Sequence, residues 1–286
     1  MADLTAGFTV AQLQAIQRLI QDCGQQAQSM ASEQFQVFEK AKNDYVTTVD
    51  RALDQRLTTG FSELFPEQRV ITEENPGSWQ AFGNQRLWLI DPLDGTEDFI
   101  QHKLHYAVMV GLMEAYEPIA GWIGAPAFNH LYYGGKQLGL FEVADDDAPI
   151  PLLPSPPEPP STHYCPLLIG DKDRRRFGQA IAKQIPGVQF DAIGSFGLKV
   201  MRVICGQAGI YVYLNKRVKL WDTTGPIALA RQAGLICCDL SGEPLKFTPD
   251  VIDPHSLAHL QTIIVGWPEY IEALLPALQK AVALTV

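Results

Sequence analysis

The apolar positions near the start of the chain repeat with the period of a helix. Their spacing predicts a helix, with one apolar face formed by Val10, Leu13, Ile16, Leu19, Ile20 and Cys23. A second periodic stretch covers residues 50–65 and ends at Pro66, which cannot continue a helix. Apolar runs predict strands at residues 70–72, 87–90, 105–112, 118–123 and 131–133. The first half is therefore expected to combine helices with a sheet.

A proline-rich segment interrupts this pattern. Seven prolines fall within residues 149–160, shortly after three consecutive aspartates. Such a segment can form neither a helix interior nor a central strand, so it is predicted to be an extended connector. We therefore predict an N-terminal α+β domain over residues 1–148 that carries most of the candidate metal ligands, the connector 149–160, and a C-terminal α/β domain over residues 161–286.

Strands and helices alternate in the second half. Apolar runs predict strands at residues 166–170, 188–193, 210–214, 235–240 and 262–265. Periodic stretches predict helices at residues 174–184, 196–207, 223–233 and 268–282. This alternation indicates an α/β layer with helices on both faces of its sheet.

Length and charge limit the classes of function. A chain of 286 residues with 47% apolar residues suits two packed globular halves. Its 22 basic and 32 acidic residues give a net charge of −10, which disfavours binding to a nucleic-acid polymer. We see no signal peptide and no apolar run of about 20 residues, so we expect a cytoplasmic protein without a membrane partner. An acidic chain can still bind a small phosphate if its carboxylates first bind cations.

The cysteines and histidines indicate no other kind of site. The five cysteines are an odd number without a C-x-x-C pair, which favours reduced thiols. His255 and His259 are spaced i, i+4 but lack a matching third ligand. We interpret them as surface or packing residues.

Two carboxylates stand at the carboxyl end of an apolar strand. Asp91 follows residues 88–90, and Asp94 comes three residues later in a turn that contains Pro92. Gly95 and Thr96 follow where a helix or turn should begin with free backbone N–H groups. Carboxylates beside such donors can hold hard divalent cations next to a phosphate. A surface turn with Asp as a helix cap is the alternative that this spacing leaves open.

Further acidic residues lie at the ends of other predicted elements. Glu73 and Glu74 directly follow a predicted strand, where a solvated loop is the simpler interpretation. Asp222 stands at the expected N-cap of a helix, where capping is the simpler interpretation and a second oxygen stays available for a metal. Hard oxygen ligands without His or Cys favour Mg²⁺ or Mn²⁺ over zinc.

Together these motifs resemble the inositol monophosphatase family, the lithium-sensitive, Mg²⁺-dependent phosphatases that include bisphosphate nucleotidases. The motifs are Glu73-Glu74, the sequence DPLDGT at residues 91–96, and Trp221-Asp222. Residues 44–50, DYVTTVD, are similar to a helix start in that family, and the resemblance extends to about Gly242. It implies a mixed α/β (α+β) fold, a layered α-β-α-β-α sandwich of the inositol monophosphatase and fructose-1,6-bisphosphatase type.

The resemblance implies a set of metal ligands. Glu73, Asp91 and the Leu93 carbonyl would bind a first Mg²⁺. Asp91, Asp94 and Asp222 would bind a second ion, and Glu73 would help to hold a third, which places it among the catalytic residues. Two such cations can stabilise both the attacking and the leaving oxygen of an in-line displacement.

The resemblance also implies roles in water activation and phosphate binding. Asp50 and Thr96 would orient and deprotonate the attacking water. The backbone amides of Gly95 and Thr96 would bind phosphate oxygens. Ser195 lies where family members contact the substrate, and Asn215 replaces the Glu of inositol-specific members.

The implied substrate is a small phosphorylated metabolite, either inositol monophosphate or a related sugar phosphate. Residues 97–100, EDFI, are closer to the corresponding run of bacterial bisphosphate nucleotidases. Hydrolysis of 3'-phosphoadenosine 5'-phosphate by a 3'(2'),5'-bisphosphate nucleotidase is therefore an alternative. Outside the enzyme class, a catalytically silent metal-binding regulatory protein is possible. The resemblance also favours a homodimer.

Overall fold

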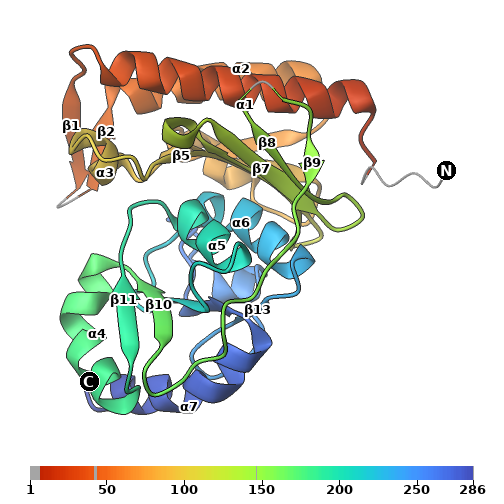
Figure 1. Cartoon of the computed structure of the whole chain (residues 1–286). Helices are drawn as coiled ribbons and strands as arrows, with labels where there is room; N and C mark the ends of the chain where they lie inside the picture. Colours follow the sequence, from red (N-terminus) through yellow and green to blue (C-terminus); the bar gives the residue numbers. More distant parts are fainter. Residues whose placement is uncertain (1–6, 42–43, 146, 286) are drawn as a thin grey trace.

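A large sheet and two helices form the first layers of the molecule (Figure 1). The computed structural model describes residues 7–41, 44–145 and 147–285. Helices α1 (Val10–Ala31) and α2 (Thr48–Leu64) lie side by side across one face of a seven-stranded sheet. Its strands in spatial order are β3 (Arg69–Thr72), β4 (Leu87–Asp94), β5 (Ala107–Glu114), β6 (Glu117–Ala125), β7 (His130–Gly135), β8 (Gly139–Ala144) and β9 (Ile150–Pro151). Only β3 and β4 are parallel within this sheet.

A smaller mixed sheet and four helices complete the stack. Its strands in spatial order are β11 (Val188–Asp191), β10 (Cys165–Ile169), β12 (Ile210–Tyr213), β14 (Ile263–Gly266) and β13 (Ile236–Cys238). Helices α5 (Phe196–Ile204) and α6 (Leu220–Gln232) lie between the two sheets, whereas α4 (Asp171–Gln184) and α7 (Pro268–Ala283) cover the far face of the smaller one. The order of layers is helix, sheet, helix, sheet, helix, which confirms the expected sandwich.

Short elements connect these layers. The hairpin β1 (Val37–Ala41) and β2 (Asp44–Thr47) precedes α2, and the five-residue helix α3 (Thr96–Ile100) follows β4. The described residues also form the 3₁₀ helices η1 (Pro76–Ala81), η2 (Pro126–Phe128) and η3 (Pro249–Val251). None of the described helices is both long enough and apolar enough to cross a membrane.

The backbone of α6 packs directly on the large sheet. A Cβ on Gly111 of β5 would lie 2.5 Å from the Gly225 nitrogen of α6, and a Cβ on Gly121 of β6 would clash with the Gly225 carbonyl. Only glycines allow this approach, because any side chain would push the helix outward. Asp222 is one helical turn before Gly225, so the contact fixes its position relative to β4 and β5.

Most predicted elements are confirmed, with differences at their ends. Helix α6 begins at Leu220 rather than Thr223, and the strand predicted from residue 105 begins at Ala107. The hairpin β1–β2 and strand β8 have no counterpart in the sequence prediction. The connector 149–160 contributes β9 to the edge of the sheet, a position that tolerates proline. The domain boundary placed there stays a prediction.

Candidate active site

Three aspartates meet where β4 ends and α6 begins. One carboxylate oxygen from each of Asp91, Asp94 and Asp222 lies within 4.8 Å of the others. Residues three apart on a regular strand point to opposite faces of its sheet. The pairing of β4 with β5 shifts register between Asp91 and Asp94, around Pro92, which has no N–H for the ladder. This irregularity allows both carboxylates to reach Asp222.

Burial makes this carboxylate cluster electrostatically unfavourable without a cation. Asp91 and Asp94 are 1% and 8% exposed. Desolvation raises the pKa of all three carboxyls, and their mutual repulsion raises those of Asp91 and Asp222 further. The pKa of Asp222 rises to about 7. A bound divalent cation would remove the repulsion, and an all-oxygen donor set suits a hard cation. The residues therefore fit the predicted metal.

Asp94 is held in place by the start of α5. Its Oδ2 accepts hydrogen bonds from Ser195 Oγ at 2.5 Å and from the Gly197 N–H at 3.0 Å. Ser195 is fully buried, and its Oγ also accepts the Leu198 N–H at 3.0 Å. The Ser195 hydroxyl is thus occupied by Asp94 and by capping α5, and the substrate contact expected of Ser195 stays a prediction. We assign Ser195 a positioning role.

Asp222 is not the N-cap that the sequence predicts. It is the third residue of α6, and Lys219 is the N-cap. The Asp222 Oδ2 accepts the Lys219 N–H at 2.6 Å, so the carboxylate folds back onto the start of its own helix. One oxygen satisfies the helix end, and the carboxylate still contributes to the cluster.

Thr96 and Asp50 form a hydrogen-bonded pair beside the cluster. The Thr96 Oγ1 lies 3.0 Å from Asp50 Oδ1 and 2.9 Å from the Leu93 carbonyl oxygen. The other Asp50 oxygen accepts the Thr47 N–H at 2.8 Å and the Thr47 hydroxyl at 2.5 Å, within a capping box that begins α2. Desolvation by burial raises the pKa of Asp50. Asp50 is thus fixed on one side and faces Thr96 with its free oxygen.

Glu73 lies at the edge of this site and is held by a lysine. Lys40 of β1 contacts Glu73 Oε1 at 2.8 Å and Glu74 Oε1 at 2.9 Å. Desolvation and the neighbouring Glu73 raise the pKa of Glu74 to about 7. Glu73 does not belong to the close group of three aspartates found among the described residues. Its role as a metal ligand stays a prediction.

An open cavity of about 890 Å³ contains these groups. The predicted residues that line it are Glu73, Asp91, Leu93, Asp94, Gly95, Thr96, Asn215 and Asp222. Gly95 adopts φ +92°, and a Cβ there would lie 2.7 Å from the His105 carbonyl oxygen, so the turn requires glycine. The Asn215 Oδ1 is buried without a hydrogen-bond partner among the described residues. Asp50 and Ser195 lie behind the cavity wall and act through Thr96 and Asp94.

Sequence analysis missed a buried cation in this wall. Lys199 of α5 is 5% exposed, lines the cavity and donates from Nζ to the Gly194 carbonyl. Desolvation lowers its pKa, whereas the charge of Asp94 raises it. In turn, the positive charge of Lys199 lowers the pKa of Asp94. The signal in the sequence was a single lysine in the otherwise apolar start of a helix.

These shifts predict how the stability of the metal-free protein depends on pH. The folded-state pKa of Asp222 is raised above its unfolded value, so the unfolded state loses its proton first as pH rises. The free energy of unfolding in EDTA should therefore fall from about pH 4 to about pH 7. Thermal unfolding in EDTA at pH 5 and pH 8 measures this effect. Asp222→Asn should reduce the difference, and an unchanged difference would contradict the assigned repulsion.

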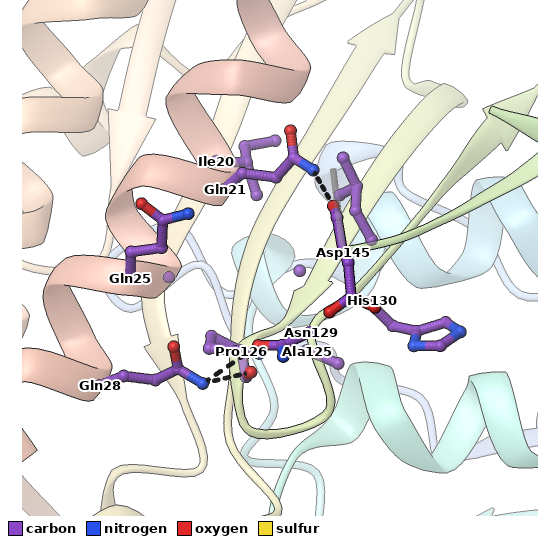
Figure 2. A pocket seen from close by; sticks show the side chains of 12 residues that line it. Ile20, Gln21, Gln25, Gln28, Ala125, Pro126, Asn129, His130 and Asp145 are labelled. Atoms are coloured by element: carbon purple, nitrogen blue, oxygen red, sulfur yellow. Dashed lines mark hydrogen bonds between the residues drawn. The ribbon is translucent and has the colours of Figure 1, made fainter. Parts of the chain in front are cut away.

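A second cavity, of about 260 Å³, lies between α1 and the turn after β6 (Figure 2). Two glutamine side chains that line it make hydrogen bonds to backbone carbonyls. Gln21 Nε2 donates to the Asp145 carbonyl at 3.1 Å, and Gln28 Nε2 donates to the Pro126 carbonyl at 2.5 Å. It shares no lining residue with the acidic cavity. We interpret these contacts as fixing α1 to the end of the large sheet.

Comparison with known proteins agrees with this geometry. A model of the inositol monophosphatase family matches residues 6–283. The 3'(2'),5'-bisphosphate nucleotidase CysQ of Escherichia coli K12 is 31% identical over 219 residues, which are 74% of this chain and 83% of CysQ. The fructose-1,6-bisphosphatase/inositol-1-monophosphatase of Aquifex aeolicus is 29% identical over 231 residues, 77% of this chain and 81% of that protein.

A solved structure shares the fold. The IMPase of Thermotoga maritima superposes with a TM-score of 0.78 at 20% identity, over 97% of this chain and all of that one. Members of the matched family act on small phosphorylated substrates and depend on metal ions. The family match over nearly the whole chain shows that this protein belongs to the inositol monophosphatase family and is a phosphoric monoester hydrolase.

Proposed function

We propose that this protein is a Mg²⁺-dependent phosphomonoesterase that hydrolyses a small phosphorylated metabolite at the acidic cavity. The close group of Asp91, Asp94 and Asp222 carries this proposal, because two buried carboxylates and a half-buried one need a cation to balance them. The Thr96–Asp50 pair beside them favours an enzyme over a silent metal-binding protein, which would not need a proton acceptor there.

The ligands divide between two or three Mg²⁺ positions. Glu73, Asp91 and the Leu93 carbonyl would hold one ion, and Asp91, Asp94 and Asp222 another, with Glu73 also available to a third. Mn²⁺ suits the same hard oxygen donors. Cations held there supply positive charge to the phosphoryl oxygens, where charge develops in phosphoryl transfer.

The chain's own residues orient the water and move its proton. The Thr96 hydroxyl accepts a proton from the attacking water and passes its own to Asp50 Oδ1, which lies 3.0 Å away. Burial raises the pKa of Asp50, which makes it a better acceptor of that proton. The amides of Gly95 and Thr96, at the turn before α3, would bind phosphate oxygens of the substrate.

Two substrate classes remain in competition. Inositol monophosphate or a related sugar phosphate is the first, with the buried, unpartnered Asn215 Oδ1 available to a hydroxyl. A 3'(2'),5'-bisphosphate nucleotide is the second, supported by the identity with CysQ. Phosphate release with Mg²⁺ from inositol 1-phosphate, fructose 1,6-bisphosphate and 3'-phosphoadenosine 5'-phosphate tests the proposal. Release from none of them would overturn it.

Lithium should inhibit the enzyme. A monovalent ion among Asp91, Asp94 and Asp222 would supply half the charge of Mg²⁺, so product should remain bound instead of leaving with its ion. Steady-state rates at millimolar Li⁺ should show inhibition that is uncompetitive with substrate. Asp222→Asn should weaken both this inhibition and turnover. Purely competitive inhibition, or none at high Li⁺, would contradict the prediction.

We also propose a cellular location and a quaternary state. We place the protein in the cytoplasm, where small phosphorylated metabolites are found, and propose a homodimer from the family resemblance. Size-exclusion chromatography with light scattering determines the mass in solution. A monomeric mass at micromolar concentration would contradict the dimer without affecting the proposed chemistry.

A further inference from the structure

We infer that Trp79 is a positioning residue of the proposed metal site, because its indole joins the segment that carries Glu73 to the segment that carries Asp222. The inference rests on the proposed function, which places Glu73 and Asp222 at two cation positions that share Asp91. Trp79 itself does not line the acidic cavity. It can therefore affect the chemistry only through the segments that hold the ligands.

The first contact of Trp79 fixes the backbone directly before Glu73. Strand β3 lies at one edge of the large sheet, with β4 as its neighbour, and Thr72 is its last residue. The Thr72 N–H donates to Ser78 Oγ at 3.1 Å, and the Thr72 carbonyl oxygen accepts the Trp79 Nε1–H at 2.8 Å. On the side of β4, the Glu73 N–H donates to the Ile90 carbonyl at 3.1 Å. The backbone that carries Glu73 is therefore bonded both to η1 and to β4.

The second contact of Trp79 reaches the residue directly before Asp222. The ring centroids of Trp79 and Trp221 lie 5.1 Å apart, and the ring planes meet at 35°. Trp221 is 1% exposed and is the second residue of α6. Aromatic pairs at such separations stabilise a structure beyond the area that they bury. The start of α6 thus packs on an indole that is hydrogen-bonded to β3.

The ring of Trp221 also contacts the residue that orients the Asp222 carboxylate. Lys219 Nζ lies over this ring, 5.2 Å from its centroid. The backbone N–H of Lys219 donates to Asp222 Oδ2 at 2.6 Å. A displaced Trp221 ring would therefore disturb the hydrogen bond that sets the direction of the carboxylate.

Glu73 and Asp222 come from different layers of the molecule. Glu73 follows a strand of the large sheet, whereas Asp222 belongs to a helix between the two sheets. The close approach of Gly225 fixes α6 to β5 and β6, and Trp79 links the same helix to the edge strand β3. Groups that hold metal ligands in place typically change metal affinity about 10–100-fold when they are removed. We therefore expect Trp79 to affect the affinity for Mg²⁺.

The Glu73 side chain has a separate contact, with Lys40 at 2.8 Å. A metal ion and the Lys40 ammonium group are both cations, so they would compete for this carboxylate. Trp79 instead holds the backbone through the Thr72 carbonyl and does not compete with a metal. Its contribution should therefore persist when the site is loaded.

Magnesium binding can be measured without substrate, because a bound ion raises the temperature of thermal unfolding. EDTA-treated wild type and variants are each titrated with Mg²⁺. Trp79→Phe keeps a ring against Trp221 but loses the hydrogen bond, so it should need about threefold more Mg²⁺ for half-maximal stabilisation, within the effect of one hydrogen bond. Trp79→Ala loses both contacts and should need at least about tenfold more.

Trp267→Phe is the matched control. Trp267 is partly buried like Trp79, and its Nε1 donates to the Val203 carbonyl at 2.9 Å. It is the N-cap of α7 and does not line the acidic cavity. Both Phe variants therefore lose the same kind of bond, and both should unfold at a lower temperature than the wild type in EDTA. Only Trp79→Phe should also need more Mg²⁺.

A second probe covers the case in which Trp79→Ala does not fold. Ser78→Ala removes the acceptor of the Thr72 N–H and leaves the indole in place. It should raise the Mg²⁺ requirement in the same direction as Trp79→Phe, because it frees the same end of β3.

The possible failures are distinguishable. Wild-type Mg²⁺ requirements in Trp79→Phe, Trp79→Ala and Ser78→Ala would overturn the positioning role and leave the proposed function intact. An equal increase in Trp267→Phe would also overturn it, because the effect would then follow from lower stability alone. If Mg²⁺ neither stabilised the wild type nor supported phosphate release from the three substrates named above, the proposed function would fail and this inference with it.

Discussion

Asp91→Asn should abolish turnover and leave the fold intact. Asp91 is the shared ligand of both proposed cation positions, and an amide cannot replace its charge. Electrostatic stabilisation is usually the largest single contribution to such catalysis, so we expect a loss of at least about 10³-fold in kcat. The fold should survive because the amide has the same shape and relieves repulsion within the buried cluster. Phosphate release at saturating Mg²⁺ and thermal unfolding in EDTA measure the two effects.

Asp22→Asn is a suitable control for this variant. Asp22 lies on α1, half-exposed, in an ion pair with Arg56 at 2.8 Å, and takes no part in the cavity. It should keep wild-type turnover. Near-normal Mg²⁺-dependent turnover in Asp91→Asn would remove the assignment of the metal site, and an unfolded Asp91→Asn protein would show that the carboxylate is structural.

Thr96→Ala should reduce kcat much more than it reduces the apparent affinity for Mg²⁺. The variant loses the hydroxyl between the cavity and Asp50 but keeps the carboxylate cluster. Loss of a positioned acid–base group typically costs about 10²–10⁴-fold in rate. Rates measured over a Mg²⁺ titration separate the two quantities, and Thr96→Ser should restore much of the rate. If Thr96→Ala needed more Mg²⁺ but reached the wild-type rate, the hydroxyl would be structural.

The sequence predicted those parts of the site that are local in the chain. Asp91 and Asp94 stand together at the end of an apolar strand, and their spacing alone indicated a cation site. Asp50 and Thr96 are 46 residues apart, and no periodicity relates them, so only the family resemblance paired them. Local spacings in the sequence cannot predict which distant side chains meet through tertiary packing.

Other features were missed for physical reasons that lie in particular residues. Ser195 was placed at the substrate by the family resemblance alone, and no local pattern indicated that its hydroxyl would donate to Asp94. The start of α6 was missed because Lys219 is not a usual N-cap residue. Asp222, the third helical residue, instead accepts a hydrogen bond from the backbone N–H of Lys219 at this helix end. Strand β8 was missed because its short segment lies in a run of turns and glycines between β7 and the connector.

Magnesium titration of EDTA-treated protein tests most directly whether Asp91, Asp94 and Asp222 form the metal site of a phosphatase. The wild type should release no phosphate from inositol 1-phosphate, fructose 1,6-bisphosphate or 3'-phosphoadenosine 5'-phosphate until Mg²⁺ is added. Asp222→Asn should require a much higher Mg²⁺ concentration, whereas Asp250→Asn, on the exposed η3, should match the wild type. Full phosphate release in EDTA, or a wild-type Mg²⁺ dependence in Asp222→Asn, would contradict the assignment.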